Sequence, residues 1–213
     1  MAVPKPTLLI ACGALAREVK HLIEANDWHG FELTCLPADL HNRPDRIPEA
    51  MRGKIREARD TGRHGNIIAL YGDCGTGGLL DAVLDEEGVE RIPGAHCYEF
   101  FAGSATFAAM TEEEIGSFYL TDYLTRFFDR LIIKGLGIDR HPELLEMYFG
   151  NYKRLVYLAQ TDDPALVALA QKAADRVGLD LVVRKVGYGE LATFMEQGAE
   201  DAEHGEPDNR LLA

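Results

Sequence analysis

Short apolar runs alternate along the chain with stretches in which apolar residues recur at helical spacing. The run Thr7 to Ala11 is followed by such a stretch from about Ala14 to Asn26, where Leu15, Val19 and Leu22 share one face of a helix. Strands that alternate with helices are the signature of a parallel sheet with crossover helices. We therefore predict an α/β fold built on a mostly parallel sheet with flanking helices.

The same alternation continues through the rest of the sequence. Asn66 to Tyr71 is a nearly continuous apolar run, as is usual for a parallel strand that is buried on both faces. Further strands are predicted at 31–36, 89–92, 117–120, 154–159 and 179–186, and further helices at 48–60, 79–86, 97–110, 122–136, 142–148, 164–177 and 190–197. This order is Rossmann-like. We expect one domain over residues 1–198, or two similar lobes that join near 115–150.

The acidic balance of the chain limits its partners. Its 213 residues carry a formal net charge of −13, which opposes binding to phosphate backbones or anionic lipid. Part of the acidic charge lies in residues 199–213, which we expect to form a flexible tail. Nucleic acid and membrane surfaces are therefore poor partners, and a small-molecule substrate is expected.

No segment of the sequence has the character of a membrane anchor. No apolar run approaches the length of about 20 residues that spans a bilayer, and the first residues lack the apolar region of a secretory signal. A cytoplasmic location is therefore expected. The four cysteines show no paired short spacing, which favours free thiols, metal ligands or a nucleophile over disulfides.

Cysteines follow several of the predicted strands. Cys12 ends the first strand, while Cys74 and Cys97 follow the third and the fourth. In open α/β sheets ligands bind beyond the carboxyl ends of the strands, so these thiols are expected to meet at one edge. His41, in the polar loop after the second strand, is a further candidate ligand. Thiolates with imidazole suit zinc or an iron–sulfur centre, although the sequence has no Cys-x-x-Cys pair.

The segment Tyr71-Gly72-Asp73-Cys74-Gly75-Thr76-Gly77-Gly78 is a glycine-rich turn that leads into a predicted helix. Backbone N–H groups at such a position bind anions and favour a thiolate. Cys74 is therefore the leading catalytic candidate, and Gly75, Gly77 and Gly78 are candidates for binding a cofactor. The turn lacks the lysine of a Walker loop, which argues against a standard nucleotide site. A tight turn without any ligand is the structural alternative.

Other polar positions have structural explanations beside their functional ones. Glu18 lies on the first helix and is a catalytic candidate that would orient a substrate, although a solvated side chain is the simpler explanation. Thr121 and Asp122 are typical of a helix N-cap. Cys35 lies inside the second strand and is expected to be a small buried apolar residue.

Several of these motifs resemble one known family. Ala11-Cys12-Gly13, Leu40-His41-Asn42, Tyr71-Gly72-Asp73-Cys74-Gly75 and His96-Cys97-Tyr98 are similar to the domain-of-unknown-function family 1638, and the similarity extends over roughly Leu8 to Leu191. The family name carries no activity. Because members occur in methanogens and in bacteria that use corrinoid-dependent methyl transfer, the resemblance implies a role in that metabolism and a corrinoid protein as partner. The Asp-x-His-x-x-Gly pattern of a corrinoid-binding loop is absent from this sequence.

The sequence supports three functional hypotheses. The leading one is a metal-dependent transferase in which Cys12, Cys74, Cys97 and His41 bind zinc or an iron–sulfur centre and a substrate thiol accepts a methyl group. The second is a metal-free enzyme with Cys74 as nucleophile and His41 or His96 as its base. The third is a non-catalytic accessory or carrier protein for a metal or corrinoid protein.

Overall fold

The computed structural model describes residues 5–204, and the chain divides into two compact units. The first unit runs to His96 and resumes at Leu191, while the second comprises Cys97–Glu190. Each contains a parallel sheet flanked by helices, so the predicted α/β, Rossmann-like fold is confirmed. A junction between two lobes was expected near 115–150, whereas the boundaries between the units lie at 96/97 and 190/191.

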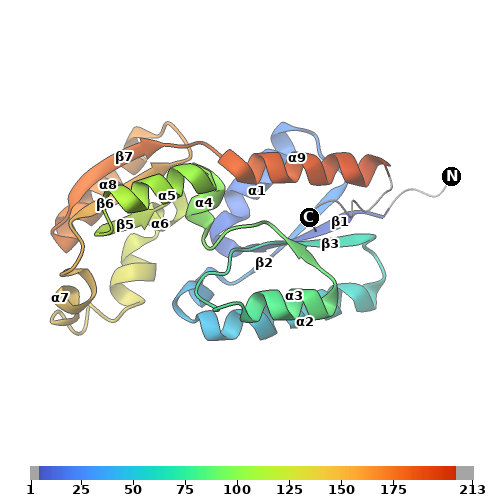
Figure 1. The fold of residues 1–213 in the computed structure, drawn as a ribbon, viewed down its shortest axis with the longest axis horizontal. Helices are drawn as coiled ribbons and strands as arrows, with labels where there is room; N and C mark the ends of the chain where they lie inside the picture. Colours follow the sequence, from blue (N-terminus) through green and yellow to red (C-terminus); the bar gives the residue numbers. More distant parts are fainter. Residues whose placement is uncertain (1–4, 205–213) are drawn as a thin grey trace. The chain divides into compact units, whose positions relative to one another are not determined.

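The first unit is built on a sheet with the strand order β2-β1-β3-β4, all parallel (Figure 1). Its elements are β1 (Thr7–Cys12), α1 (Ala16–Ala25), β2 (Phe31–Leu36), the 3-10 helix η2 (Ala38–Asn42), α2 (Ile47–Thr61), β3 (Asn66–Leu70), α3 (Leu79–Glu87), β4 (Glu90–Arg91) and α9 (Gly189–His204). Sequence periodicity predicted each of these positions to within a few residues, apart from η2, where a loop was expected, and the extent of α9.

Helices cover both faces of this sheet. α2 and α3 cover one face, where Ile47, Met51 and Ile55 recur every fourth residue and pack with β-strand residues such as Ile10. The helices α1 and α9 lie on the opposite face (Figure 1), and the α9 backbone at Gly198 comes close to Ile68 of β3. Burial on both faces explains why β1 and β3 are almost entirely apolar.

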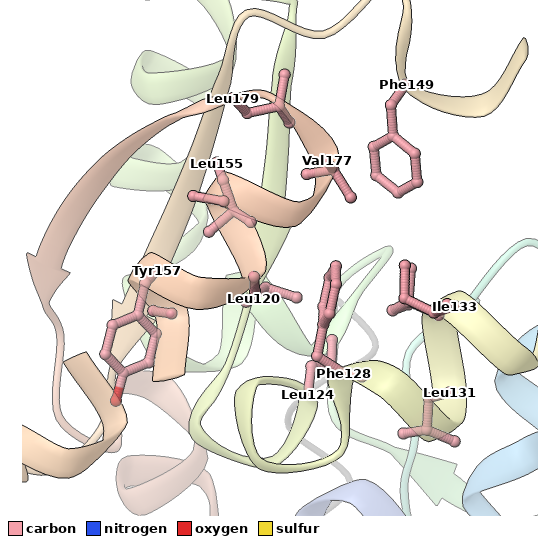
Figure 2. Close-up of a cluster of buried hydrophobic side chains, with 14 of the residues drawn as sticks. Leu120, Leu124, Phe128, Leu131, Ile133, Phe149, Leu155, Tyr157, Val177 and Leu179 are labelled. Atoms are coloured by element: carbon pink, nitrogen blue, oxygen red, sulfur yellow. The ribbon is translucent and has the colours of Figure 1, made fainter. Parts of the chain in front are cut away.

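The second unit is built on the sheet β5-β6-β7, also parallel. Its elements are α4 (Cys97–Ala102), α5 (Ser104–Glu113), β5 (Ser117–Leu120), α6 (Asp122–Arg126), a π-helical segment (Asp129–Lys134), α7 (Leu144–Phe149), β6 (Arg154–Ala159), α8 (Pro164–Val177) and β7 (Asp180–Lys185). Leu155 and Tyr157 of β6 face the cluster shown in Figure 2, while Val156 and Leu158 belong to a smaller cluster that includes Met110 of α5. The β6 strand is therefore buried on both faces.

Three predicted segments differ from the structure. The helix predicted over 97–110 is divided at Gly103 into α4 and α5. The helix predicted over 122–136 is interrupted, because α6 ends at Arg126 and a π-helical segment begins at Asp129. Leu131, Ile132 and Ile133 are all buried there, whereas a regular α-helix spreads three consecutive residues over about 200°. The acidic tail was predicted over 199–213, yet α9 extends to His204, and residues 205–213 lie outside the described part.

Within residues 5–204, no helix is both long enough and apolar enough to cross a bilayer.

Candidate functional site

The strand order of the first unit places Cys12 and the Cys74 turn on either side of a topological switch point. From β1 the chain passes through α1 to β2 on one side, whereas from β3 it passes through α3 to β4 on the other. Ligands of open α/β sheets bind at the carboxyl ends of the strands where the direction reverses in this way. Cys12 is the last residue of β1, and Cys74 follows the end of β3. The topology therefore brings both thiols to the position where this fold binds ligands.

The two thiols share one environment. Cys12 and Cys74 are half-buried, and both pack against the apolar cluster between the sheet and α2. Burial raises the pKa of Cys12, although hydrogen bonds from the Ala14 N–H and the Tyr71 side chain oppose the shift. Burial, followed by the charges of Cys12 and Asp73, raises the pKa of Cys74 to about 12. Without a metal, both thiols are therefore protonated at neutral pH, which does not favour the nucleophile hypothesis.

Cys74 has a left-handed backbone, with φ of 49°. In this region the Cβ of an L-residue lies too close to its own carbonyl group, at a cost of about 1–2 kcal/mol, and glycine avoids that cost. The Cys74 N–H donates to the Ala95 carbonyl oxygen at 2.8 Å, which fixes the turn against the segment after β4. A non-glycine residue held in this conformation is a marker of functional sites. Such conformations also occur in ordinary turns, and Asp27 has one as well, with φ of 55°.

Asp73 occupies the anion-binding position of the glycine-rich turn. Its carboxylate accepts hydrogen bonds from the N–H groups of Gly75, Gly77 and Gly78 at 3.2, 3.2 and 2.8 Å. The Thr76 hydroxyl donates to the same carboxylate at 2.5 Å, and this bond, followed by those of the glycine amides, lowers the pKa of Asp73 to about 2. A cofactor anion bound to these glycine amides, as expected from the sequence, would have to displace the charged Asp73 side chain.

His41 lies in η2, in the loop that follows β2. Burial, followed by the charge of His96, lowers the pKa of His41. The two imidazoles are therefore close enough for their charges to interact. The same loop reaches the glycine-rich turn, because a Cβ on Gly75 would lie 3.8 Å from the Pro44 ring. The exits of β1, β2, β3 and β4 thus form one continuous edge that carries two thiols and two imidazoles.

The remaining predicted residues lie elsewhere or have other surroundings. Cys97 is the first residue of α4 and belongs to the second unit, whereas Cys12, Cys74 and His41 belong to the first. Glu18 is buried on α1, so the expectation of a solvated side chain is wrong. Cys35 is half-buried in β2. Across residues 5–204, no three His, Cys, Asp or Glu side chains are placed so that they could bind a metal ion as they stand.

Sequence reasoning missed a buried carboxylate in the second unit. Thr121 caps α6 as predicted, since its Oγ1 accepts the Leu124 N–H at 3.3 Å. Asp122 is an acidic residue in the first turn of α6. Its carboxylate also accepts hydrogen bonds from the Tyr157 hydroxyl, the Gln160 N–H and the Thr161 hydroxyl at 2.7, 3.0 and 2.6 Å. The sequence carried one signal for this role, because Asp122 lies two residues after a predicted strand. Gln160 and Thr161 follow β6 in the same way.

Fold and site together define an α/β protein with a thiol- and imidazole-containing edge at the switch point of a parallel sheet. The chain belongs to the family described as "Protein of unknown function (DUF1638)", whose model matches residues 35–195. This match confirms the family resemblance over residues 35–195, whereas the Ala11-Cys12-Gly13 motif lies outside the matched segment. No curated protein and no solved structure matches the chain.

The left-handed backbone of Cys74 makes a prediction about stability. At ordinary positions alanine stabilises a protein relative to glycine by about 0.5–1 kcal/mol. At position 74 we expect the reverse, with Cys74→Gly more stable than Cys74→Ala by about 1 kcal/mol, because only alanine retains the strained Cβ. Urea unfolding followed by fluorescence of Trp28, the single tryptophan of the chain, measures the difference.

The matched control for this comparison is Cys12. Its φ is −63°, which any residue adopts without strain. Cys12→Ala should therefore be more stable than Cys12→Gly. The same order at both positions would show that Cys74 is not strained.

Proposed function

We propose that the carboxyl edge of the first unit is a soft-metal site of an enzyme, in which Cys12 and Cys74 supply thiolates and His41 an imidazole to zinc or an iron–sulfur centre. The observation that carries the proposal is the position of Cys74. It is a strained thiol beside a second thiol at the switch point of a parallel sheet. Thiolate and imidazole ligands select zinc and iron–sulfur centres over magnesium or calcium.

The residues do not form a ready-made coordination set. No three ligand side chains in the described part of the chain are placed to bind a metal together. Metal binding at this edge would therefore require rotation of side chains, and it would release the protons of both thiols. A substrate thiol would complete the set at an open position, as in zinc enzymes with three protein ligands.

The substrate class in this proposal is a small thiol. The family resemblance adds methyl transfer from a methylated corrinoid protein as the reaction to assay. In that reaction the substrate thiol would become a methyl thioether and release its proton, and the corrinoid of the partner protein would supply the methyl group and keep the electron pair of its broken bond. None of the residues at this edge identifies the corrinoid protein, so that partner rests on the resemblance alone.

Metal analysis of the untagged protein, purified without oxygen, tests the proposal. We expect about one equivalent of zinc, or iron and sulfide in cluster proportions, in the wild type. Cys12→Ser and Cys74→Ser should each reduce metal affinity by at least about tenfold, because serine is a poor ligand for these metals. Less than about 0.2 equivalents of any transition metal, without uptake on titration with zinc, would overturn the proposal.

Cys35→Ser is the matched control, since Cys35 is also half-buried in the first unit and lies inside β2. Its metal content should equal that of the wild type. Metal binding without turnover of thiols in a broad methyl-transfer screen would support the metal site. It would also identify the protein as a metal carrier and not as an enzyme.

A further inference from the structure

Arg91, the last residue of β4, connects α3 with the segment that follows the strand. Its Nε and Nη2 donate to the two carboxylate oxygens of Asp81 at 2.5 and 3.0 Å. Its Nη1 donates to the carbonyl oxygens of Ile92 and Gly94 at 2.9 and 3.0 Å. The side chain is only 17% exposed. A planar guanidinium satisfies all of these acceptors at once, which an ammonium group cannot do in the same geometry.

The segment that Arg91 fixes is the segment that receives the Cys74 turn. The Gly94 carbonyl oxygen, an acceptor of Arg91, also accepts the Asp73 N–H at 3.3 Å. The neighbouring Ala95 carbonyl oxygen accepts the Cys74 N–H at 2.8 Å. Hydrogen bonds therefore lead from the carboxylate on α3, through Arg91 and the Gly94 carbonyl oxygen, to the Asp73 N–H, and the next residue in each segment makes the bond between Ala95 and Cys74.

The other end of the turn is fixed independently. Asp73 accepts the N–H groups of Gly75, Gly77 and Gly78, so the residues after Cys74 cannot rotate without breaking bonds to a carboxylate. Cys74 is thus restrained at its own N–H and on its carboxyl side. Left-handed strain persists only where the surroundings over-determine the backbone in this way.

We propose that Arg91 is a positioning residue for Cys74, because it holds the Gly94 carbonyl group, which lies next to the Ala95 carbonyl group that accepts the Cys74 N–H. In this conformation Cys74 packs against the same apolar cluster as Cys12. The use of this positioning rests on the proposed function of Cys74, whereas the hydrogen bonds of Arg91 are present in the metal-free protein.

A double-mutant cycle tests the proposal. Arg91→Met loosens the carbonyl groups in both a Cys74→Ala and a Cys74→Gly background. The alanine relaxes out of the strained region and recovers part of the loss, whereas the glycine has no strain to recover. We therefore expect Arg91→Met to reduce the folding equilibrium constant about fivefold more in the Cys74→Gly background. Equal losses in the two backgrounds would overturn the proposal.

Arg52 of α2 provides the matched control. Its side chain is 18% exposed and pairs with Glu49 and Glu86, away from the turn. Arg52→Met should destabilise the two backgrounds equally, as a structural arginine would. If Arg91→Met does not fold, Arg91→Lys replaces it, because lysine lacks the fork that reaches both Asp81 and the carbonyl oxygens.

Hydrogen exchange of the peptide 71–78 gives a second readout. Arg91→Lys should accelerate exchange of the Asp73 and Cys74 amides by about tenfold, and Arg52→Lys should leave it unchanged. Unchanged exchange in the Arg91 variant would also overturn the proposal. Because both measurements use the metal-free protein, their failure is distinct from a failure of wild-type protein to bind metal.

Discussion

Replacing Asp122 with alanine is expected to lower the free energy of unfolding by about 3–5 kcal/mol. The carboxylate is 3% exposed and accepts the Tyr157 hydroxyl, the Gln160 N–H and the Thr161 hydroxyl. Alanine leaves the buried Tyr157 hydroxyl and Gln160 N–H without an acceptor, and each unsatisfied buried group costs about 1–3 kcal/mol, whereas the hydroxyl of the exposed Thr161 can bond to water. The two strand ends of β5 and β6 would lose the side chain that joins them.

Urea unfolding followed by far-UV circular dichroism measures this loss. Asp122→Asn is the conservative comparison, because the amide retains one oxygen acceptor and nearly the same volume, and it should cost less than the alanine variant. Tyr157→Phe removes a single donor and should cost about 1 kcal/mol. A loss below about 1 kcal/mol for Asp122→Ala would mean that water replaces the carboxylate, and that the network is not structural.

Gly72→Ala is expected to destabilise the first unit by about 1–3 kcal/mol and to disrupt the Cys74 turn. A Cβ at this position would lie 3.0 Å from the Ala95 carbonyl oxygen and 3.1 Å from the His96 backbone nitrogen. Both neighbours are backbone atoms, so they cannot move aside as a flexible side chain would. The segment after β4 would be pushed away, which would break the hydrogen bond from the Cys74 N–H to Ala95.

Trp28 fluorescence during urea unfolding, together with metal uptake, measures both effects of Gly72→Ala. Gly53→Ala is the matched control, because Gly53 lies within α2 and nothing lies within 4 Å of an added Cβ. That variant should stabilise the helix by about 0.5–1 kcal/mol and leave metal uptake unchanged. If Gly72→Ala were equally harmless, the segments after β3 and β4 would not lie as close together as the structure places them.

Much of the fold could be predicted from local sequence pattern. β1, β3 and β6 are continuous apolar runs because helices cover both faces of each sheet, and α2 and α8 have apolar residues at helical spacing. The interruption between α6 and the π-helical segment could not be predicted, since it depends on burying three consecutive apolar residues. The return of α9 to the first unit depends on packing beside Ile68, far away in sequence.

The candidate site could be predicted in part, for a similar reason. Cys12, His41 and Cys74 each follow a strand, and parallel topology places all strand exits at one edge. The sequence also pointed to Gly75, Gly77 and Gly78 as free amides, but Asp73 takes them as its own donors. A short-range hydrogen bond can compete with a ligand, and residue spacing alone does not reveal which of them prevails.

Local sequence patterns were enough to predict the α/β class and the edge of the sheet on which the thiols of the first unit lie, because periodicity and chain direction are local properties. The family followed from sequence motifs. Three features are visible only in the folded chain: the left-handed conformation of Cys74, its hydrogen bond to the segment after β4, and the place of Cys97 in a different unit. Backbone strain and hydrogen-bond pairing depend on residues brought together from distant segments, so they exist only in the folded chain.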